Sequence, residues 1–386
     1  MFKHYLLVTF RSILKDKGYS IVNIVGLSIA IACCLLLIFW IRFELSFEKN
    51  YSNADRIFKV IEIEQRVDGI FYEDYIRDNI GTTLKERFPQ IEALTFMSHE
   101  LLPFVVDGTD GDGIMADYTT ANPDYIKMFS YIYLEGSPQG VAQSKEAIIS
   151  EEMAIRFFGS PRDAIRKTIS FGNTLRITIG AVVRIPKNTQ IHFDILDLYR
   201  SQRVRGLLYV MLKKGVQLTP DFEQQIKGVL STQRETENTL MLQPLLDVHL
   251  HSPKEITKSE AQGKFGDLKQ IYLFSLAALL ILVIAVINYV NTSIARALSR
   301  MKEVGVRKIT GSNRWQLVIR FLFESFVIAL IGMILSLALV KYAFPAFCYD
   351  NQNIDYFFNS HFNYFLLLLT NVSSVPSAFI ISSMVF

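Results

Sequence analysis

The sequence predicts an α-helical membrane protein with four transmembrane helices and a mixed α/β extracytoplasmic domain inserted between the first and second spans. Half of the 386 residues are hydrophobic, and the long continuous apolar runs form four segments. Each segment is long enough to cross a bilayer, which requires about 20 mostly apolar residues. Between the first and second segments, residues 44–269 have the mixed, charged composition that is typical of a folded domain outside the membrane.

Residues 1–18 predict an amphipathic helix in the membrane interface, because apolar residues recur there at helical spacing opposite basic ones. The first span, 19–43, follows directly. Its apolar run is too long for a signal peptide, and no small-residue cleavage site follows it. We therefore expect this span to be retained. Its N-terminus should lie in the cytoplasm, since four bases precede it: Lys3, Arg11, Lys15 and Lys17.

The extracytoplasmic domain, 44–269, carries short strand and helix signals in turn. Alternating apolar residues predict strands, and apolar residues at helical spacing before Pro or Gly predict helices. The expected strands are Arg56–Glu64, Ala147–Ser150 and Leu175–Arg184, and the expected helices are Asp74–Phe88 and Glu151–Phe158.

Three further spans complete the predicted topology. The second span is expected at 270–294, the third at 315–341 and the fourth at 362–386, with a cytoplasmic loop at 295–314 and a short outer loop at 342–361. Lys and Arg resist translocation, so the strongly basic loop belongs inside. One interpretation is that these charges only fix the orientation of the loop in the membrane. In and around this loop, Glu303 is the single acid before Glu324, against seven bases: Arg296, Arg300, Lys302, Arg307, Lys308, Arg314 and Arg320.

The sequence contains no motif for common catalytic, nucleotide or metal chemistry. A phosphate-binding G-x-x-x-x-G-K-[ST] loop, H-E-x-x-H and paired C-x-x-C spacing are all missing, so we expect no cofactor in this chain. His249 and His251 would share a face if Leu245–His251 formed a strand, but no third ligand is in view, which favours a structural pair. The net charge of +3 gives no reason to expect a nucleic-acid partner.

The order of residues in the basic loop carries more information than its charge. Lys302-Glu303-Val304-Gly305-Val306-Arg307-Lys308 is followed by Thr310-Gly311-Ser312-Asn313-Arg314 and then by Phe321-Leu322-Phe323-Glu324-Ser325. This order resembles the cytoplasmic loop of MacB/FtsX-type ABC transporter permeases. Shorter phrases of the large domain resemble the periplasmic domain of the same family: Asn53–Phe58, Asn122–Tyr125, Gly180–Val183, Pro186–Asn188 and Leu245–Ser252.

The resemblance implies a non-catalytic permease subunit of the mechanotransmission type in the bacterial inner membrane. Such a subunit transmits the ATP-driven motion of a separate ATPase, which holds ATP and Mg²⁺, to its extracytoplasmic domain. It thereby promotes export or release of an envelope substrate such as a lipoprotein, peptide, toxin or drug. The resemblance places the contacts with the ATPase at Arg300, Lys302, Glu303, Gly305, Arg307 and Lys308.

Glu324 is a carboxylate within the third span, and such groups are costly and often functional. Arg320 stands one helical turn earlier, so the two are expected to form an ion pair near the cytoplasmic end. The resemblance makes this pair part of the hinge between loop and helix. A proton relay is the less favoured alternative.

Several questions of assembly and role stay open at this stage. The sequence ends at Phe386 without a basic tail, so we expect a second permease half, as a homodimer or a C-terminal repeat. A periplasmic adaptor or envelope partner is a further expected contact. An FtsX-like regulator that activates an envelope hydrolase without moving cargo is one alternative. A membrane-anchored receptor without an ATPase is another.

Overall fold

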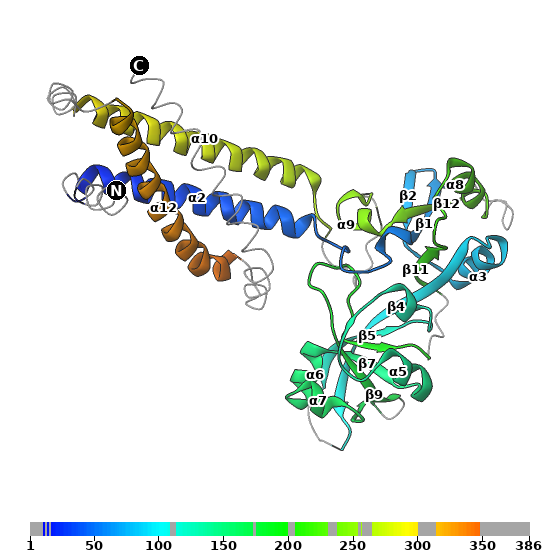
Figure 1. Ribbon diagram of the computed structural model, residues 1–386. Coiled ribbons are helices and arrows are strands. Elements are labelled where there is room, and N and C mark those ends of the chain that lie inside the picture. Colours follow the sequence, from blue (N-terminus) through cyan, green and yellow to red (C-terminus); the bar gives the residue numbers. More distant parts are fainter. Residues whose placement is uncertain are drawn as a thin grey trace. The chain divides into compact units, whose positions relative to one another are not determined.

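A computed structural model describes most of the chain: residues 17–108, 113–172, 175–199, 205–230, 238–253, 265–299 and 314–347, together with positions 11, 14 and 256. The chain divides into two compact units. A helical unit comprises Met1–Arg42 and Lys269–Phe386, and an extracytoplasmic unit comprises Phe43–Leu268, where the sequence analysis expected 44–269. Figure 1 shows the elements of both.

The described residues of the helical unit form three long helices: α2 (Lys17–Glu44), α10 (Leu268–Ser299) and α12 (Arg314–Phe347). Each contains a segment long and apolar enough to cross a membrane, with mean hydropathies of 2.8, 2.7 and 2.4. These are the only such segments in the described part of the chain. The expected fourth span at 362–386 lies outside the described residues, as does most of the expected interfacial helix at 1–18.

Helix α2 packs against both of the other helices. Trp40 meets Phe274 of α10 edge to face, with ring centroids 4.9 Å apart. On α12, a Cβ added at Gly332 would lie 3.3 Å from Leu27, so the absence of a side chain there permits close approach. An apolar cluster of Ala32, Leu35 and Val340 continues this contact toward the C-terminal end of α2.

In its described residues, the extracytoplasmic unit is built from twelve strands and several short helices. The first strands are β1 (Ile57–Arg66), β2 (Gly69–Glu73), β3 (Tyr75–Arg77), β4 (Ile91–Val106), β5 (Ile114–Thr120) and β6 (Ile132–Glu135). The others are β7 (Ala147–Ser150), β8 (Thr168–Phe171), β9 (Leu175–Arg184), β10 (Ile195–Asp197), β11 (Arg205–Leu212) and β12 (Thr239–Pro244). The helices are η1 (Ala54–Arg56), α3 (Asp78–Arg87), α4 (Tyr125–Met128), α5 (Pro138–Ser144), α6 (Glu151–Phe158), α7 (Pro161–Ala164), α8 (Pro220–Lys227), η2 (Leu245–Asp247) and α9 (Val248–His251).

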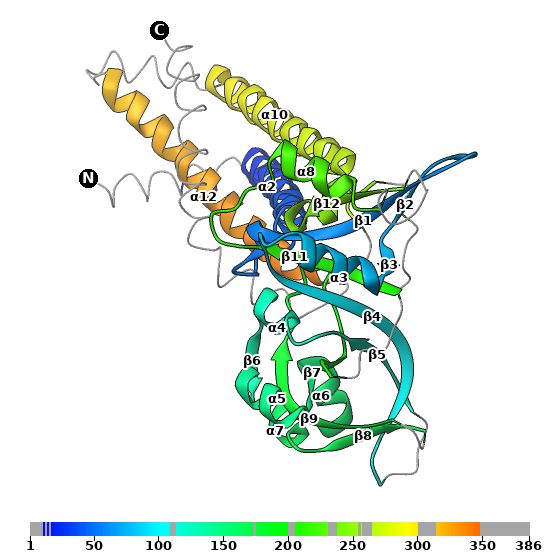
Figure 2. The ribbon, with the colours of Figure 1, turned by 90° about the vertical axis from the view of Figure 1, so that its right-hand side faces the viewer.

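The strands form one mixed sheet in the order β12-β1-β11-β4-β5-β10-β7-β9-β6, with β2, β3 and β8 attached at its sides. The long, curved β4 joins the two halves of this sheet, as Figure 2 shows. Its first part, Ile91–Met97, pairs antiparallel with β11, and its second part, Ser98–Phe104, pairs antiparallel with β5. The pairs β5–β10 and β7–β9 are parallel.

Three apolar clusters fill the unit. One lies between the first half of the sheet and α3 and α8, and includes Leu84 and Phe222. Another lies beneath α6 and α7 and includes Met153 and Ala164. The central cluster is rich in aromatic residues: Tyr51, Tyr125, Phe129, Phe193 and Tyr209 are all at most 3% exposed.

Local sequence signals explain where several elements begin and end. Strand β7, helix α6 and strand β9 have the bounds that the sequence predicts. Ser150 Oγ caps α6 by accepting the N–H of Met153, and Gly159 ends the helix at a φ of 83°. One expectation was wrong: residues 75–77 form strand β3 against β11, so the helix starts only at Asp78. The strand that would have placed His249 and His251 on one face does not form, because Leu245–His251 is helical.

Candidate functional site

The residues that the resemblance assigns to ATPase contact lie outside the described part of the chain. This holds for Arg300, Lys302, Glu303, Gly305, Arg307 and Lys308. Arg320 belongs to α12, but its side chain is not described. Glu324 lies in the same helix and is 5% exposed. The ATPase contacts and the Arg320–Glu324 pair therefore stay predictions.

The structure describes a different candidate site, at the base of the extracytoplasmic unit. Here the chain leaves α2, and here it returns toward α10. We call this site the joint and define it by seven residues of the extracytoplasmic unit: Glu44, Phe47, Glu48, Asn188, Thr189, Gln190 and His249.

The segment after α2 is fastened to the loop between β9 and β10. The amide Nδ2 of Asn188 donates to the backbone oxygen of Ser46 at 2.9 Å and to its Oγ at 2.8 Å. The N–H of Glu48 donates to the carbonyl of Asn188 at 3.0 Å. Glu48 adopts a φ of 62°, which is uncommon for a residue with a side chain and indicates that the surrounding contacts hold it there.

The Glu48 side chain is fully buried. Thr189 Oγ1 donates to its Oε2 at 2.7 Å, and the N–H of Gln190 donates to its Oε1. Burial raises the pKa of Glu48 to about 7, against the lowering effect of these two hydrogen bonds. Tyr51 extends the network, since its hydroxyl lies 3.0 Å from Thr189 Oγ1, and burial raises the pKa of this phenol as well.

His249 connects the end of α2 with the segment that leads to α10. Its ring stacks on Phe47 at a centroid distance of 3.5 Å. Its Nε2 lies 2.7 Å from Glu44 Oε2, and its Nδ1 lies 2.9 Å from Gln190 Nε2. With Nε2 facing the Glu44 carboxylate and Nδ1 facing the Gln190 amide nitrogen, the arrangement fits the tautomer that donates from Nε2 and accepts at Nδ1. The carbonyl of His249 accepts the N–H of Gly266 at 2.9 Å, two residues before α10.

The two histidines do not form a pair. His249 is buried in the joint, whereas His251 is half exposed, with Nδ1 3.3 Å from Asp247 Oδ1. Both residues belong to helix α9, where the two side chains do not share a face as they would in a strand. No group of three or more metal-ligating side chains occurs among the described residues.

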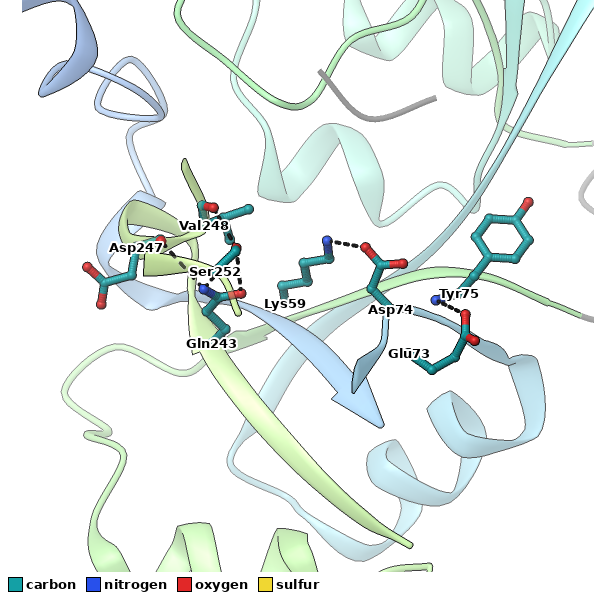
Figure 3. A network of polar contacts seen from close by, with 8 residues as sticks. All are labelled: Lys59, Glu73, Asp74, Tyr75, Gln243, Asp247, Val248 and Ser252. Atoms are coloured by element: carbon teal, nitrogen blue, oxygen red, sulfur yellow. Dashed lines mark hydrogen bonds and ion pairs between the residues drawn. The ribbon is translucent and has the colours of Figure 1, made fainter. Parts of the chain in front are cut away.

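A second buried polar contact, between Lys59 and Asp74, lies close to the segment before α10 (Figure 3). Lys59 Nζ of β1 lies 2.7 Å from Asp74 Oδ2, and both side chains are fully buried. Burial lowers the pKa of Lys59, an effect that the charge of Asp74 opposes. The Phe265 ring, just before α10, lies 5.9 Å from Nζ. The ion pair therefore ties β1 to the β2–β3 connection beneath the segment that leads to α10.

Sequence reasoning did not find the joint. Asn188 and His249 lie in Pro186–Asn188 and Leu245–Ser252, which stand out in the sequence only through their resemblance to the family. Glu48 follows the first span without any motif around it. The available signal was the place of one of these phrases, Leu245–Ser252, before the second span.

Comparison with known proteins identifies two family models along the chain. Residues 20–229 match the model of a MacB-like periplasmic core domain, and residues 275–386 match that of the FtsX-like permease C-terminal domain. Curated relatives include the macrolide export ATP-binding/permease protein MacB 1 of Yersinia pestis and that of Yersinia pseudotuberculosis, each 21% identical over 239 residues. The match covers 58% of this chain and 35% of each relative, so the chain spans about a third of their length.

Solved structures of two protein domains are also similar. A domain of a putative permease from Porphyromonas gingivalis has a TM-score of 0.42 and 19% identity, over 50% of this chain and 91% of that one. The periplasmic region of MacB from Actinobacillus actinomycetemcomitans has a TM-score of 0.37 and 15% identity, over 49% of this chain and 89% of that one.

Proposed function

This chain belongs to the family of ABC transporter permeases with a MacB-like periplasmic core domain and an FtsX-like C-terminal domain, and from that premise we propose that it transmits the motion of a separate ABC ATPase to its extracytoplasmic unit. ATP and Mg²⁺ would bind to the ATPase. The chain itself would act as a non-catalytic subunit in the bacterial inner membrane, with its N-terminus in the cytoplasm and a second permease half as partner.

The joint is the observation that supports this proposal. Helix α2 runs without interruption to Glu44, and α10 begins at Leu268, so each helix enters the unit through a covalent connection near the joint. Glu44 and Gly266 both contact His249, and His249 in turn contacts Gln190. A relative movement of the two helix ends would therefore act on residues 188–190 of the loop that leads to β10.

The basic loop is the proposed input of this motion. Polar contacts at the rim of an interface are worth only about 0–1 kcal/mol each. Gly305 would permit the close approach of the ATPase, so a bulky residue there should disturb binding more than a single charge change. The proposed cargo is an envelope substrate such as a lipoprotein, peptide, toxin or drug. The similar curated relatives carry names that describe macrolide export.

Co-purification in detergent with candidate ABC ATPases tests the proposal. We expect the wild-type chain to retain an ATPase and the Gly305→Trp/Arg307→Glu variant to lose it. Arg162→Glu, which reverses an exposed charge on α7 of the extracytoplasmic unit, is the matched control and should retain it.

Failure of the wild-type chain to bind any ATPase, also when a second permease half is supplied, would refute the proposal and favour a receptor role. An ATPase that remains bound to the loop variant would place the contact elsewhere. An envelope hydrolase that the wild-type complex activates without moving cargo would favour the FtsX-like regulator.

A further inference from the structure

We propose that Glu48 binds a proton and thereby controls how stable the closed joint is, in which the hydrogen bonds around Glu48 are intact. Acid on the outer side of the membrane then stabilises the closed joint. This regulation rests on the proposed function for its consequence, because stiffness of the joint matters only if motion passes through it. The proton site itself stands on the geometry of the extracytoplasmic unit.

The carboxyl group of Glu48 is buried close to the end of α2. Glu48 has 0% exposure and lies four residues after the end of α2. Its two oxygens contact the N–H of Gln190 and the hydroxyl of Thr189, which are neutral donors. A buried carboxylate held only by neutral donors keeps much of the cost of its lost hydration.

Other titratable groups lie around Glu48. Tyr51 from the same segment and Tyr209 from β11 both interact electrostatically with Glu48, and burial raises the pKa of each phenol well above its usual value. Both phenols are therefore neutral near pH 7. Asp74 acts on Tyr209 as well, and the pair of Glu44 and His249 reaches the network through Gln190.

The hydrogen-bond network accommodates either protonation state of Glu48. A carboxylate accepts from Thr189 Oγ1 at 2.7 Å, and a carboxylic acid can donate to the same oxygen. Thr189 Oγ1 can then direct its proton to the Tyr51 hydroxyl, 3.0 Å away. The closed joint favours the neutral acid, whereas a joint opened to water favours the charged form.

The pH window follows from linkage. Burial in the closed joint raises the pKa of Glu48 from 4.5 to about 7. Below pH 4.5 the group is neutral in both states and the closed joint has its full stability. As the pH rises from 4.5 to 7, only the open state loses its proton, so opening becomes easier. Above pH 7 both states are charged and the effect levels off.

Hydrogen exchange of the full-length chain in detergent, without ATPase, tests the proton site. The informative amides are those of Gln190 and Ile191, whose N–H groups donate to Glu48 and to Thr189 Oγ1. After correction for the intrinsic exchange rate, we expect their protection in the wild type to fall on the order of 50-fold between pH 5 and pH 8. In Glu48→Gln, which mimics the neutral acid, protection should stay high and independent of pH.

The matched control is Glu62→Gln, which removes a largely buried carboxylate from β1 and should keep the wild-type pH dependence. Protection in the wild type that does not change between pH 5 and pH 8 would overturn the proposal even if no variant folds. Equal pH dependence in wild type and Glu48→Gln would overturn it too. Since the measurement needs no ATPase, failure of the chain to bind one would refute the proposed function and leave this result standing.

Discussion

Replacing Lys59 by methionine is expected to destabilise the extracytoplasmic unit by about 3–5 kcal/mol. The substitution removes the only strong cationic partner that the structure describes for Asp74, at 2.7 Å, and leaves that carboxylate with no exposure to water. Asp74 Oδ1 already lacks a hydrogen-bond partner. An uncompensated buried charge is far more costly than the loss of a surface pair.

The double variant Lys59→Met/Asp74→Leu distinguishes this explanation from loss of packing. Because it removes both charges, we expect it to recover most of the lost stability. Native-state hydrogen exchange at core amides of the full chain in detergent measures both variants. A cost below about 1 kcal/mol for Lys59→Met would show that Asp74 finds water or another partner easily.

Phe193→Ala is expected to cost about 3–5 kcal/mol, because it opens a cavity in the central aromatic cluster. Phe193 is fully buried and meets Tyr125 and Tyr131 edge to face, with centroids 6.2 and 5.6 Å apart. It stands three residues after Gln190, so its loss should also reduce amide protection at the loop of the joint. Thermal unfolding together with hydrogen exchange measures both effects.

Phe157→Ala serves as the control for Phe193→Ala. Phe157 lies on α6, is only partly buried and packs against a different cluster. We expect a smaller loss of stability and no change in protection at Gln190. An equal reduction at Gln190 in both variants would indicate a general loosening of the unit and no specific support of the joint by Phe193.

The elements that the sequence predicts correctly have local causes. Strand β7, helix α6 and strand β9 follow from alternation, from the cap at Ser150 and from the stop at Gly159. Strand β3 was missed because its extended form depends on pairing with β11, 130 residues later in the chain at Arg205. The 16-residue strand β4 likewise owes its length to three different partners, β11, β5 and β8.

The joint could not be predicted because its contacts join distant parts of the chain. Glu48 and Gln190 are 142 residues apart, and Glu44 and His249 are 205 residues apart. Neither side chain has a neighbour in sequence that reveals its partner. The basic loop presents the opposite case, since the order of residue types from Lys302 to Lys308 carries the resemblance to the family in the sequence itself.

The measurement that tests the central claim most directly is hydrogen exchange at the joint in complex with a bound ABC ATPase, compared between a non-hydrolysable ATP analogue and ADP. If motion of the ATPase reaches the extracytoplasmic unit through the joint, protection at the amides of Glu48 and Gln190 must differ between the two nucleotides. Identical protection in both states, with an ATPase that is bound and active, would contradict transmission through the joint.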